Sequence, residues 1–105
     1  MPKGIMVVQS RPVSAEREAE YNDWYDNTHI PEILAIPGFV SARRYKVPGP
    51  EPIYLAIYDL EAEHLSVPVT DLGARSAVGR MTPSDAIQLD PRPVATVYEE
   101  FGGAS

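Results

Sequence analysis

FVSARRYKVPGPEPIYLAIYDL, residues 39–60, places two strand-like segments on either side of a linker dense in proline. Residues 53–60 are rich in β-branched and aromatic side chains, which favour strands. Residues 39–46 follow the turn signal Pro37-Gly38 and have a similar strand-like character. Because the linker over residues 47–52 is short and stiff, the two segments predict an antiparallel hairpin.

The chain before this hairpin predicts one strand and one helix. Residues 4–10 form a short run that is apolar on both faces, as in a central strand. Residues 15–28 follow Ser14, a residue type that caps helices, and place apolar and aromatic side chains three or four positions apart. Pro31 is expected to end or break this helix, with one further short turn over residues 31–35.

The chain after the hairpin predicts helical structure and a last strand. Residues 61–81 have a helical pattern that Pro68, Gly73 and Gly79 interrupt, so we expect one or two short helices. Residues 82–93 are expected to be irregular, and residues 94–101 read as a strand. The 105 residues form a single domain, residues 1–105, with the order β-α-β-β-α-β.

That order predicts an α+β fold of the ferredoxin-like type: a four-stranded antiparallel sheet with both helices on one face. The predicted strands carry apolar residues on both faces, as in residues 5–8 and 55–58. The face without helices therefore needs a cover, and we expect a homodimer that packs sheet against sheet.

Composition excludes several classes of partner and site. Nine Lys and Arg against 15 Asp and Glu give a net charge of −6, which disfavours binding to nucleic acid or to an anionic membrane. The chain has no cysteine, so it has neither disulfides nor a thiolate metal site. No apolar run approaches the length of a bilayer-spanning helix, and the N-terminus lacks a signal-peptide pattern. We expect a cytoplasmic protein that has no membrane contact.

The most informative chemical pattern is Tyr21, Tyr25 and His29, which lie along one helical face at i, i+4 and i+8. An imidazole at the end of such a stripe can accept and return a proton, and Tyr25 can orient it or bind a substrate oxygen. The alternative is that the tyrosines belong to the core and that His29 interacts with the last helical carbonyls.

Two adjacent arginines point to opposite faces of the strand over residues 39–46. If Phe39, Arg43 and Tyr45 share the helix-side face, a guanidinium and a phenol lie beside His29 and can stabilise an enolate oxygen. The alternative is that Arg43 and Arg44 both pair with acids at the rim of a dimer.

Several of these motifs together resemble the dimeric α/β-barrel superfamily, most closely its EthD-like small proteins. The matching residues are Tyr21-x-x-Trp24-Tyr25-x-x-x-His29-Ile30-Pro31-Glu32, Ile36-Pro37-Gly38-Phe39 and Ala42-Arg43-Arg44-Tyr45. The resemblance implies paired ferredoxin-like subunits with a substrate pocket between helices and sheet. It also implies reactions such as quinone-forming monooxygenation, polyketide cyclisation or lactone isomerisation.

The resulting hypothesis is a small cofactor-independent enzyme that transfers protons on an aromatic, polyketide-like or lactone substrate. His29, Tyr25 and Arg43 are the predicted catalytic residues. The predicted substrate-binding residues are Tyr21, Trp24, Phe39, Tyr45, Tyr54 and Tyr58. We expect no cofactor and no metal, since Asp26, His29 and Glu32 diverge around the helix, and His64 beside two acids reads as a surface residue. The alternatives are a non-catalytic protein that binds a small hydrophobic ligand or assists a pathway enzyme, and a purely structural dimer.

Overall fold

A four-stranded antiparallel sheet forms one layer of the molecule. The computed structural model describes residues 1–103. Its strands are β1 (Lys3–Ser10), β2 (Phe39–Lys46), β3 (Tyr54–Glu61) and β4 (Val94–Glu99). They lie in the order β2-β3-β1-β4, and every neighbouring pair is antiparallel. The predicted α+β fold is therefore confirmed, with strand ends within two residues of the expected ones.

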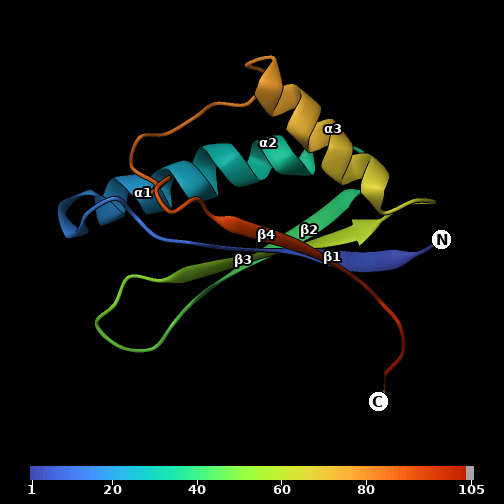
Figure 1. Ribbon diagram of the computed structural model, residues 1–105, viewed down its shortest axis with the longest axis horizontal. Helices are drawn as coiled ribbons and strands as arrows, with labels where there is room; N and C mark the ends of the chain where they lie inside the picture. Colours follow the sequence, from blue (N-terminus) through green and yellow to red (C-terminus); the bar gives the residue numbers. More distant parts are fainter. Residues whose placement is uncertain (104–105) are drawn as a thin grey trace.

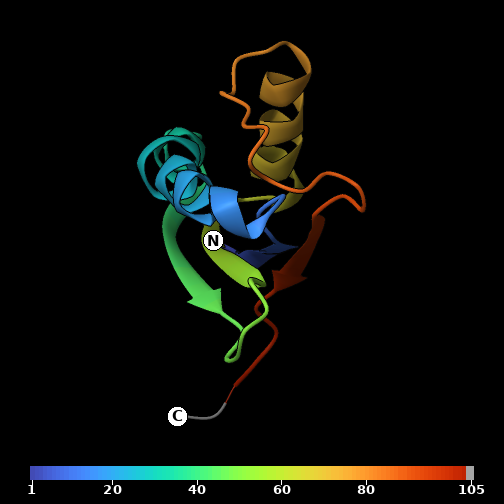
Figure 2. The same ribbon diagram turned by 90° about the vertical axis from the view of Figure 1, so that its left-hand side faces the viewer.

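The helices all lie on one side of this sheet (Figure 1). The first helical stretch consists of η1 (Ala15–Arg17), α1 (Glu18–Trp24), η2 (Tyr25–His29) and α2 (Ile30–Leu34), and the second is α3 (Ser66–Ala77). A view turned by 90° shows the two helical stretches side by side over the same face, with β2 and β4 at the two flanks of the sheet (Figure 2). The other face of the sheet carries no helix among residues 1–103.

The first helical stretch continues through Pro31, contrary to the expected break. Pro31 lies near the start of α2, and the turn immediately before it, η2, is a π-helix. A wider π turn changes the hydrogen-bond pairing around a proline, whose nitrogen has no hydrogen to donate, so the helix axis can carry on. The consequence is local: residues 25–29, which include His29, sit in an unusual helical turn.

The second helical region forms one helix, not two. Pro68 lies in the first turn of α3, where a missing N–H costs little. The helix ends at Ala77, and Gly79 follows the C-cap Val78 with a φ of +74°, a left-handed conformation that glycine adopts easily. The Gly79 N–H donates to the Ser76 carbonyl at 3.2 Å, and the Arg80 N–H donates to the Arg75 carbonyl at 2.8 Å. These two bonds form a Schellman cap.

The core fills the space between the helices and the covered face of the sheet. Alternate residues of β1 and β3 point into it, and among these Met6, Tyr58 and Leu60 are at most 2% exposed. The remaining buried hydrophobic residues are Tyr21, Tyr25, Ile33, Ile36, Phe39, Ala56, Leu65 and Ala86. A large share of this core is aromatic, and the aromatic rings come from the first helical stretch, β2 and β3.

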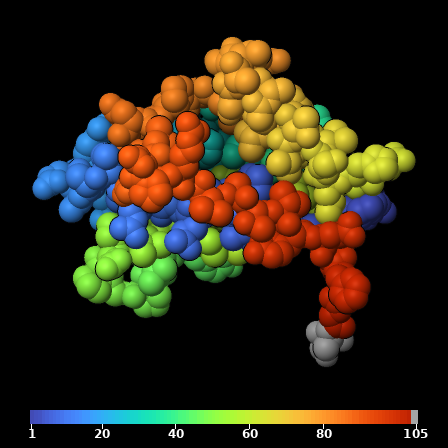
Figure 3. Space-filling view, in the orientation of Figure 1, coloured from blue at the N-terminus to red at the C-terminus, as the bar shows by residue number. Residues whose placement is uncertain are grey.

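The segment between α3 and β4 is irregular, as predicted, but it is held against the rest of the molecule. Pro12 and Ile87 form an isolated antiparallel bridge, and the Val13 N–H donates to the Ala86 carbonyl at 2.6 Å. The space-filling view shows this segment, in orange, packed across the end of the helical layer and down onto the sheet (Figure 3). Within residues 1–103 no helix combines the length and the apolar character that crossing a membrane requires.

Candidate functional site

A cluster of tyrosines occupies the layer between helix and sheet. Tyr21 and Tyr25 reach it from α1 and η2, and Tyr54 and Tyr58 reach it from β3. Tyr21, Tyr25 and Tyr58 are at most 1% exposed, and the Tyr21 hydroxyl lies 2.6 Å from Ser10 Oγ on β1. We call Tyr21, Tyr25, Tyr54 and Tyr58 the tyrosine cluster. Four of the residues that the sequence predicted for the site thus meet in one place.

Burial keeps the phenols of Tyr21, Tyr25 and Tyr58 protonated. It raises the pKa of Tyr21 to about 12, although the Ser10 hydroxyl opposes this effect by bonding to the phenol oxygen. Burial also raises the pKa of Tyr25 and of Tyr58. A neutral phenol can donate a hydrogen bond to a negative oxygen, so these residues can stabilise an oxyanion but are poor bases.

The guanidinium in this cluster belongs to Arg44, not to Arg43. Its central carbon lies 4.4 Å from the ring centre of Tyr25 and 5.0 Å from that of Tyr54. Arg44 also donates to the Asn22 side-chain oxygen at 2.9 Å and pairs with Asp26 at 3.0 Å. Since its side chain is only 15% exposed, this cation is largely shielded from water.

Arg43 points to the opposite face of the sheet, which corrects its expected place beside His29. There it forms an ion pair with Asp59 at 2.6 Å, and Asp59 also accepts from Ser41 at 2.5 Å. The physical reason is an irregularity in the pairing of β2 with β3 between Phe39 and Ser41. Phe39 therefore faces the helices, as expected, whereas the alternation after the irregularity sends Tyr45 and Arg43 away from them.

His29 lies at the end of η2 and is enclosed by aromatic rings. Trp24 stacks on its imidazole at 4.4 Å between ring centres, with 19° between the planes, and Tyr25 meets it edge-on at 5.2 Å. Burial lowers the pKa of His29 to about 4, and the nearby Glu32 carboxylate opposes this effect only in part. The imidazole is therefore neutral at physiological pH, and its Nδ1 atom is buried without a hydrogen-bond partner within residues 1–103.

A clamp at Thr82 holds the irregular segment over this region. The Glu32 carboxylate accepts from the Thr82 N–H at 2.8 Å and from the Thr82 hydroxyl at 2.6 Å. The Thr82 carbonyl accepts from the Trp24 indole N–H at 3.0 Å. The hydrogen bonds that the Glu32 carboxylate accepts from Thr82 lower the pKa of Glu32. No sequence pattern pointed to Thr82, because a residue in an irregular segment lies outside the periodicity of a helix or strand.

Two other polar atoms in this layer are also buried and unpartnered within residues 1–103. They are Arg44 Nε and the Tyr58 hydroxyl, and with His29 Nδ1 they come from β2, β3 and the first helical stretch. Folded proteins pair the great majority of such groups, because an unpaired buried donor or acceptor costs about 1–3 kcal/mol. In native proteins an ordered water, local strain, a bound ligand or a catalytic role accounts for such an atom.

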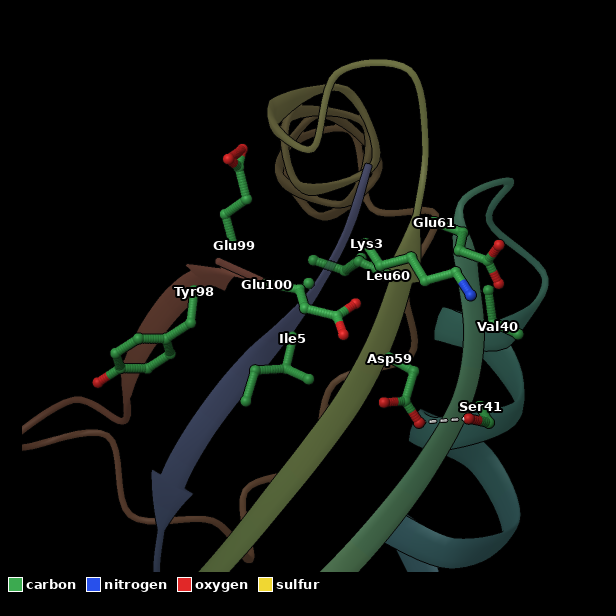
Figure 4. Close-up of a pocket in the computed structure, with 11 residues that line it drawn as sticks. Lys3, Ile5, Val40, Ser41, Asp59, Leu60, Glu61, Tyr98, Glu99 and Glu100 are labelled. Carbon is green, nitrogen blue, oxygen red and sulfur yellow. Dashed lines mark hydrogen bonds between the residues drawn. The ribbon is translucent and has the colours of Figure 1, made fainter. Parts of the chain in front are cut away.

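Three open hollows of the molecule lie outside the immediate surroundings of His29. One of about 540 Å³ is formed on the uncovered face of the sheet, and Ile5, Asp59 and Tyr98 are among the residues that line it (Figure 4). A second, of about 650 Å³, borders Trp24 and Thr28 beneath residues 83–85. A third, of about 370 Å³, lies at the end of β1. His29 lines none of these three hollows, although Trp24, which stacks on it, borders the second.

The described part of the chain contains no ready-made metal centre: residues 1–103 bring no three His, Cys, Asp or Glu side chains together as ligands. His64, the second histidine of the chain, is exposed just before α3. The chemical groups that the structure brings together at this site are one neutral imidazole, neutral phenols and one shielded guanidinium.

Comparison with solved structures finds the same fold in two bacterial proteins. One is a "putative monooxygenase" from Shewanella loihica PV-4, with a TM-score of 0.63 and 12% sequence identity, covering 98% of this chain and 99% of that one. The other is an ethyl tert-butyl ether d (EthD) family protein from Bacillus halodurans C-125, with a TM-score of 0.54 and 15% identity, covering 93% and 99%. No family model and no curated protein matches the sequence. At these identities the similarity establishes the fold alone.

Proposed function

We propose that this protein is a small cofactor-independent enzyme of the dimeric α/β-barrel type, which transfers a proton on an aromatic, polyketide-like or lactone substrate. The observation that carries the proposal is the trio of buried, unpartnered polar atoms: His29 Nδ1, Arg44 Nε and the Tyr58 hydroxyl. Together they offer one proton acceptor and two hydrogen-bond donors in an aromatic layer, a combination that suits a carbon acid next to a carbonyl group.

In this proposal His29 removes a proton from the carbon beside the substrate carbonyl. In its neutral state the imidazole has one ring nitrogen with a lone pair that can accept the proton, and Nδ1 is the nitrogen buried without a hydrogen-bond partner within residues 1–103. The enolate oxygen that develops is stabilised by the phenols of Tyr58 and Tyr25 and by the positive charge of Arg44, which takes the role first expected of Arg43. Return of the proton to another carbon is isomerisation, and attack of the enolate carbon on a second carbonyl is cyclisation.

In this mechanism the substrate enters from the hollow of about 650 Å³ and passes Trp24 to reach His29. Trp24 separates the imidazole from the hollow of about 650 Å³, and the Thr82 clamp holds its indole N–H. A rotation of Trp24 would join the hollow to the imidazole without disturbing the sheet. An aromatic substrate can replace the Trp24 ring as the stacking partner of His29, which favours planar substrates.

The direct test measures exchange of carbon-bound hydrogen for deuterium in heavy water, using a panel of phenols, cyclic ketones and lactones. We expect the protein to accelerate exchange on a subset of the panel and the His29→Ala variant to lose at least a hundredfold of that rate. The matched control is His64→Ala, which removes the other, exposed histidine and should keep the full rate. Equal rates in the two variants would overturn the assignment of His29.

The packing of the tyrosine cluster favours a second candidate, a non-catalytic protein that binds a small hydrophobic ligand or assists a pathway enzyme. Tyr21, Tyr25 and Tyr58 fill the layer with almost no exposed surface, as a structural core does. The His29→Phe variant separates the two functions, because phenylalanine keeps the stacking with Trp24 but cannot accept a proton. A binding protein retains its affinity for the ligand in this variant, whereas an enzyme loses turnover.

The proposal includes a homodimer formed through the uncovered face of the sheet. Tyr45 and Tyr98 lie on this face and are 50% and 54% exposed, and the half-buried Ile5, Val7, Leu55 and Ile57 lie between them. Exposed apolar surface of this kind is stabilised by a partner. Light scattering should give a mass of about twice 11.6 kDa, and Ile57→Glu should reduce it to that of one chain. A wild-type monomer at 100 µM, a concentration on the order used for weak dimers, would exclude it.

A further inference from the structure

The hollow of about 370 Å³ at the end of β1 differs in charge from the rest of the molecule. Its lining contains two arginines, Arg11 and Arg92, and no carboxylate. The hollow on the open sheet face is lined by four carboxylates, and the one beside Trp24 by three. In a chain with net charge −6, a carboxylate-free hollow with two guanidinium groups is unexpected from composition alone.

Neither of these arginines has a partner in the described part of the chain. Most of the other basic side chains do: Arg17, Arg43, Arg44, Lys46 and Arg75 each pair with a carboxylate within 4.0 Å. Within residues 1–103, Arg11 and Arg92 form neither an ion pair nor a side-chain hydrogen bond. Two unpaired like charges lining one hollow repel each other, and a bound anion would offset that repulsion.

The backbone around the hollow is held in place. The Gln88 N–H donates to the Arg11 carbonyl at 2.9 Å, and the Gln88 side-chain amide donates to the Asp90 carbonyl at 2.9 Å. Pro12 bridges Ile87, and Gln9 pairs with Val94 across β1 and β4. The segments that carry Arg11 and Arg92 are thus tied to each other and to the sheet, so the two side chains start from fixed positions.

We propose that this hollow binds an organic carboxylate that carries a small apolar body. A guanidinium group matches the planar, bidentate geometry of a carboxylate. Ile53, Pro91, Pro93 and Val94 form the apolar part of the wall, and Gln9 and Gln88 add amide groups at the rim. The hollow lies apart from the residues that line His29, so the proposal does not depend on the proposed reaction.

The experiment titrates the intact protein with benzoate, a carboxylate on an apolar ring, and follows amide chemical shifts by NMR. We expect saturable shifts centred on Gln9, Gln88 and Val94, which become weaker as salt is raised because the charges are partly exposed. Arg11→Gln and Arg92→Gln should each weaken benzoate binding about tenfold, the loss of one charge-assisted contact. Arg92 is exposed, so its variant keeps the proposal testable even if Arg11→Gln unfolds.

Two controls separate this site from general attraction between an anion and arginine. Arg80→Gln removes another unpaired, exposed arginine outside the hollow and should leave benzoate affinity within twofold. Benzyl alcohol, the neutral analogue, should not compete with benzoate. The absence of saturable binding, an equal loss in Arg80→Gln, or a preference for inorganic phosphate over benzoate would overturn the proposal. His29→Ala should bind benzoate normally, so failure of the proposed reaction leaves this result unaffected.

Discussion

Arg43 and Arg44 are adjacent in β2, yet the two faces of the sheet give them opposite surroundings. Arg44 is 15% exposed, lies over the rings of the tyrosine cluster and bonds to Asn22 and Asp26 on the helical layer. Arg43 is 49% exposed and pairs with a single carboxylate, Asp59, on the uncovered face. One step along a strand thus separates a shielded cation among aromatic rings from an ordinary surface ion pair.

This difference shows which parts of the molecule can perform chemistry. On the covered face, low dielectric strengthens charge interactions, and burial lowers the pKa of His29 and raises that of Tyr21. On the uncovered face, water screens the same kinds of group, and a single ion pair there contributes little to stability. Variants matched across the two faces therefore test the comparison directly.

The largest expected effect contrasts two tyrosines on opposite faces. Tyr58→Ala removes a fully buried ring from the core and should lower the free energy of unfolding by about 3–5 kcal/mol. Tyr45→Ala removes a half-exposed ring and should cost less than about 1 kcal/mol in the monomer. Urea unfolding measures both. If the loss in Tyr45→Ala grows with protein concentration, the uncovered face is buried in a dimer; equal losses at low concentration would contradict the comparison.

The next effect is a pH dependence that comes from His29. Because burial lowers its folded pKa from 6.5 to about 4, the unfolded chain takes up the proton first as the pH falls. The contribution of His29 to the free energy of unfolding is therefore fully present above about pH 6.5. It is lost as the pH falls from there to about 4, and the total loss is about 3 kcal/mol. Between pH 4 and 6.5 the free energy of unfolding of the wild type should rise with pH, and this rise should be absent in His29→Phe. Thermal unfolding at several pH values measures both. The His64→Ala variant should follow the wild type, and a slope that persists in His29→Phe would assign it to other groups.

The sequence predicted the elements of this fold well, because the strands and helices are short and strongly patterned. Residues 39–46 were expected as a strand and form β2 without any change of boundary. The stripe of Tyr21, Tyr25 and His29 depends only on helical periodicity, and it does converge on one layer. The face of the sheet to which Arg43 points could not be predicted. The pairing irregularity between Phe39 and Ser41 reverses the in–out alternation of the side chains that follow, and the residue types do not indicate it.

Long-range pairing within irregular segments was also beyond prediction. The Thr82 clamp joins residues 50 and 58 positions apart, and the hollow between Arg11 and Arg92 brings together residues from opposite ends of the chain. The π turn at η2 was missed for a related reason. Pro31 signals a helix end, and only the surrounding packing decides whether a wider turn accommodates it instead.

Arg44 is also expected to contribute more to the stability of the fold than Arg43. Arg44→Met keeps much of the side-chain volume but loses the bonds to Asn22 and Asp26 and the contact with the Tyr25 ring. It should lower the free energy of unfolding by about 2 kcal/mol, whereas Arg43→Met should cost about 0.5 kcal/mol because its ion pair is screened. Chemical denaturation of the two variants at the same salt concentration measures the two losses in the free energy of unfolding. A larger loss for Arg43 would mean that the uncovered face is the more shielded one.

The smallest effect concerns the clamp that holds the irregular segment near the covered face. Thr82→Val keeps the shape of the side chain and the N–H bond to Glu32 but removes the hydroxyl bond of 2.6 Å, so it should cost about 1 kcal/mol. The change should also loosen the segment over Trp24, which hydrogen exchange at residues 80–86 can detect as faster exchange. Thr70→Val, at an exposed position of α3, is the matched control and should change neither quantity. If Thr82→Val leaves exchange unchanged, the Trp24 bond and the Pro12 bridge hold the segment alone, and access to His29 is governed by Trp24 and not by the clamp.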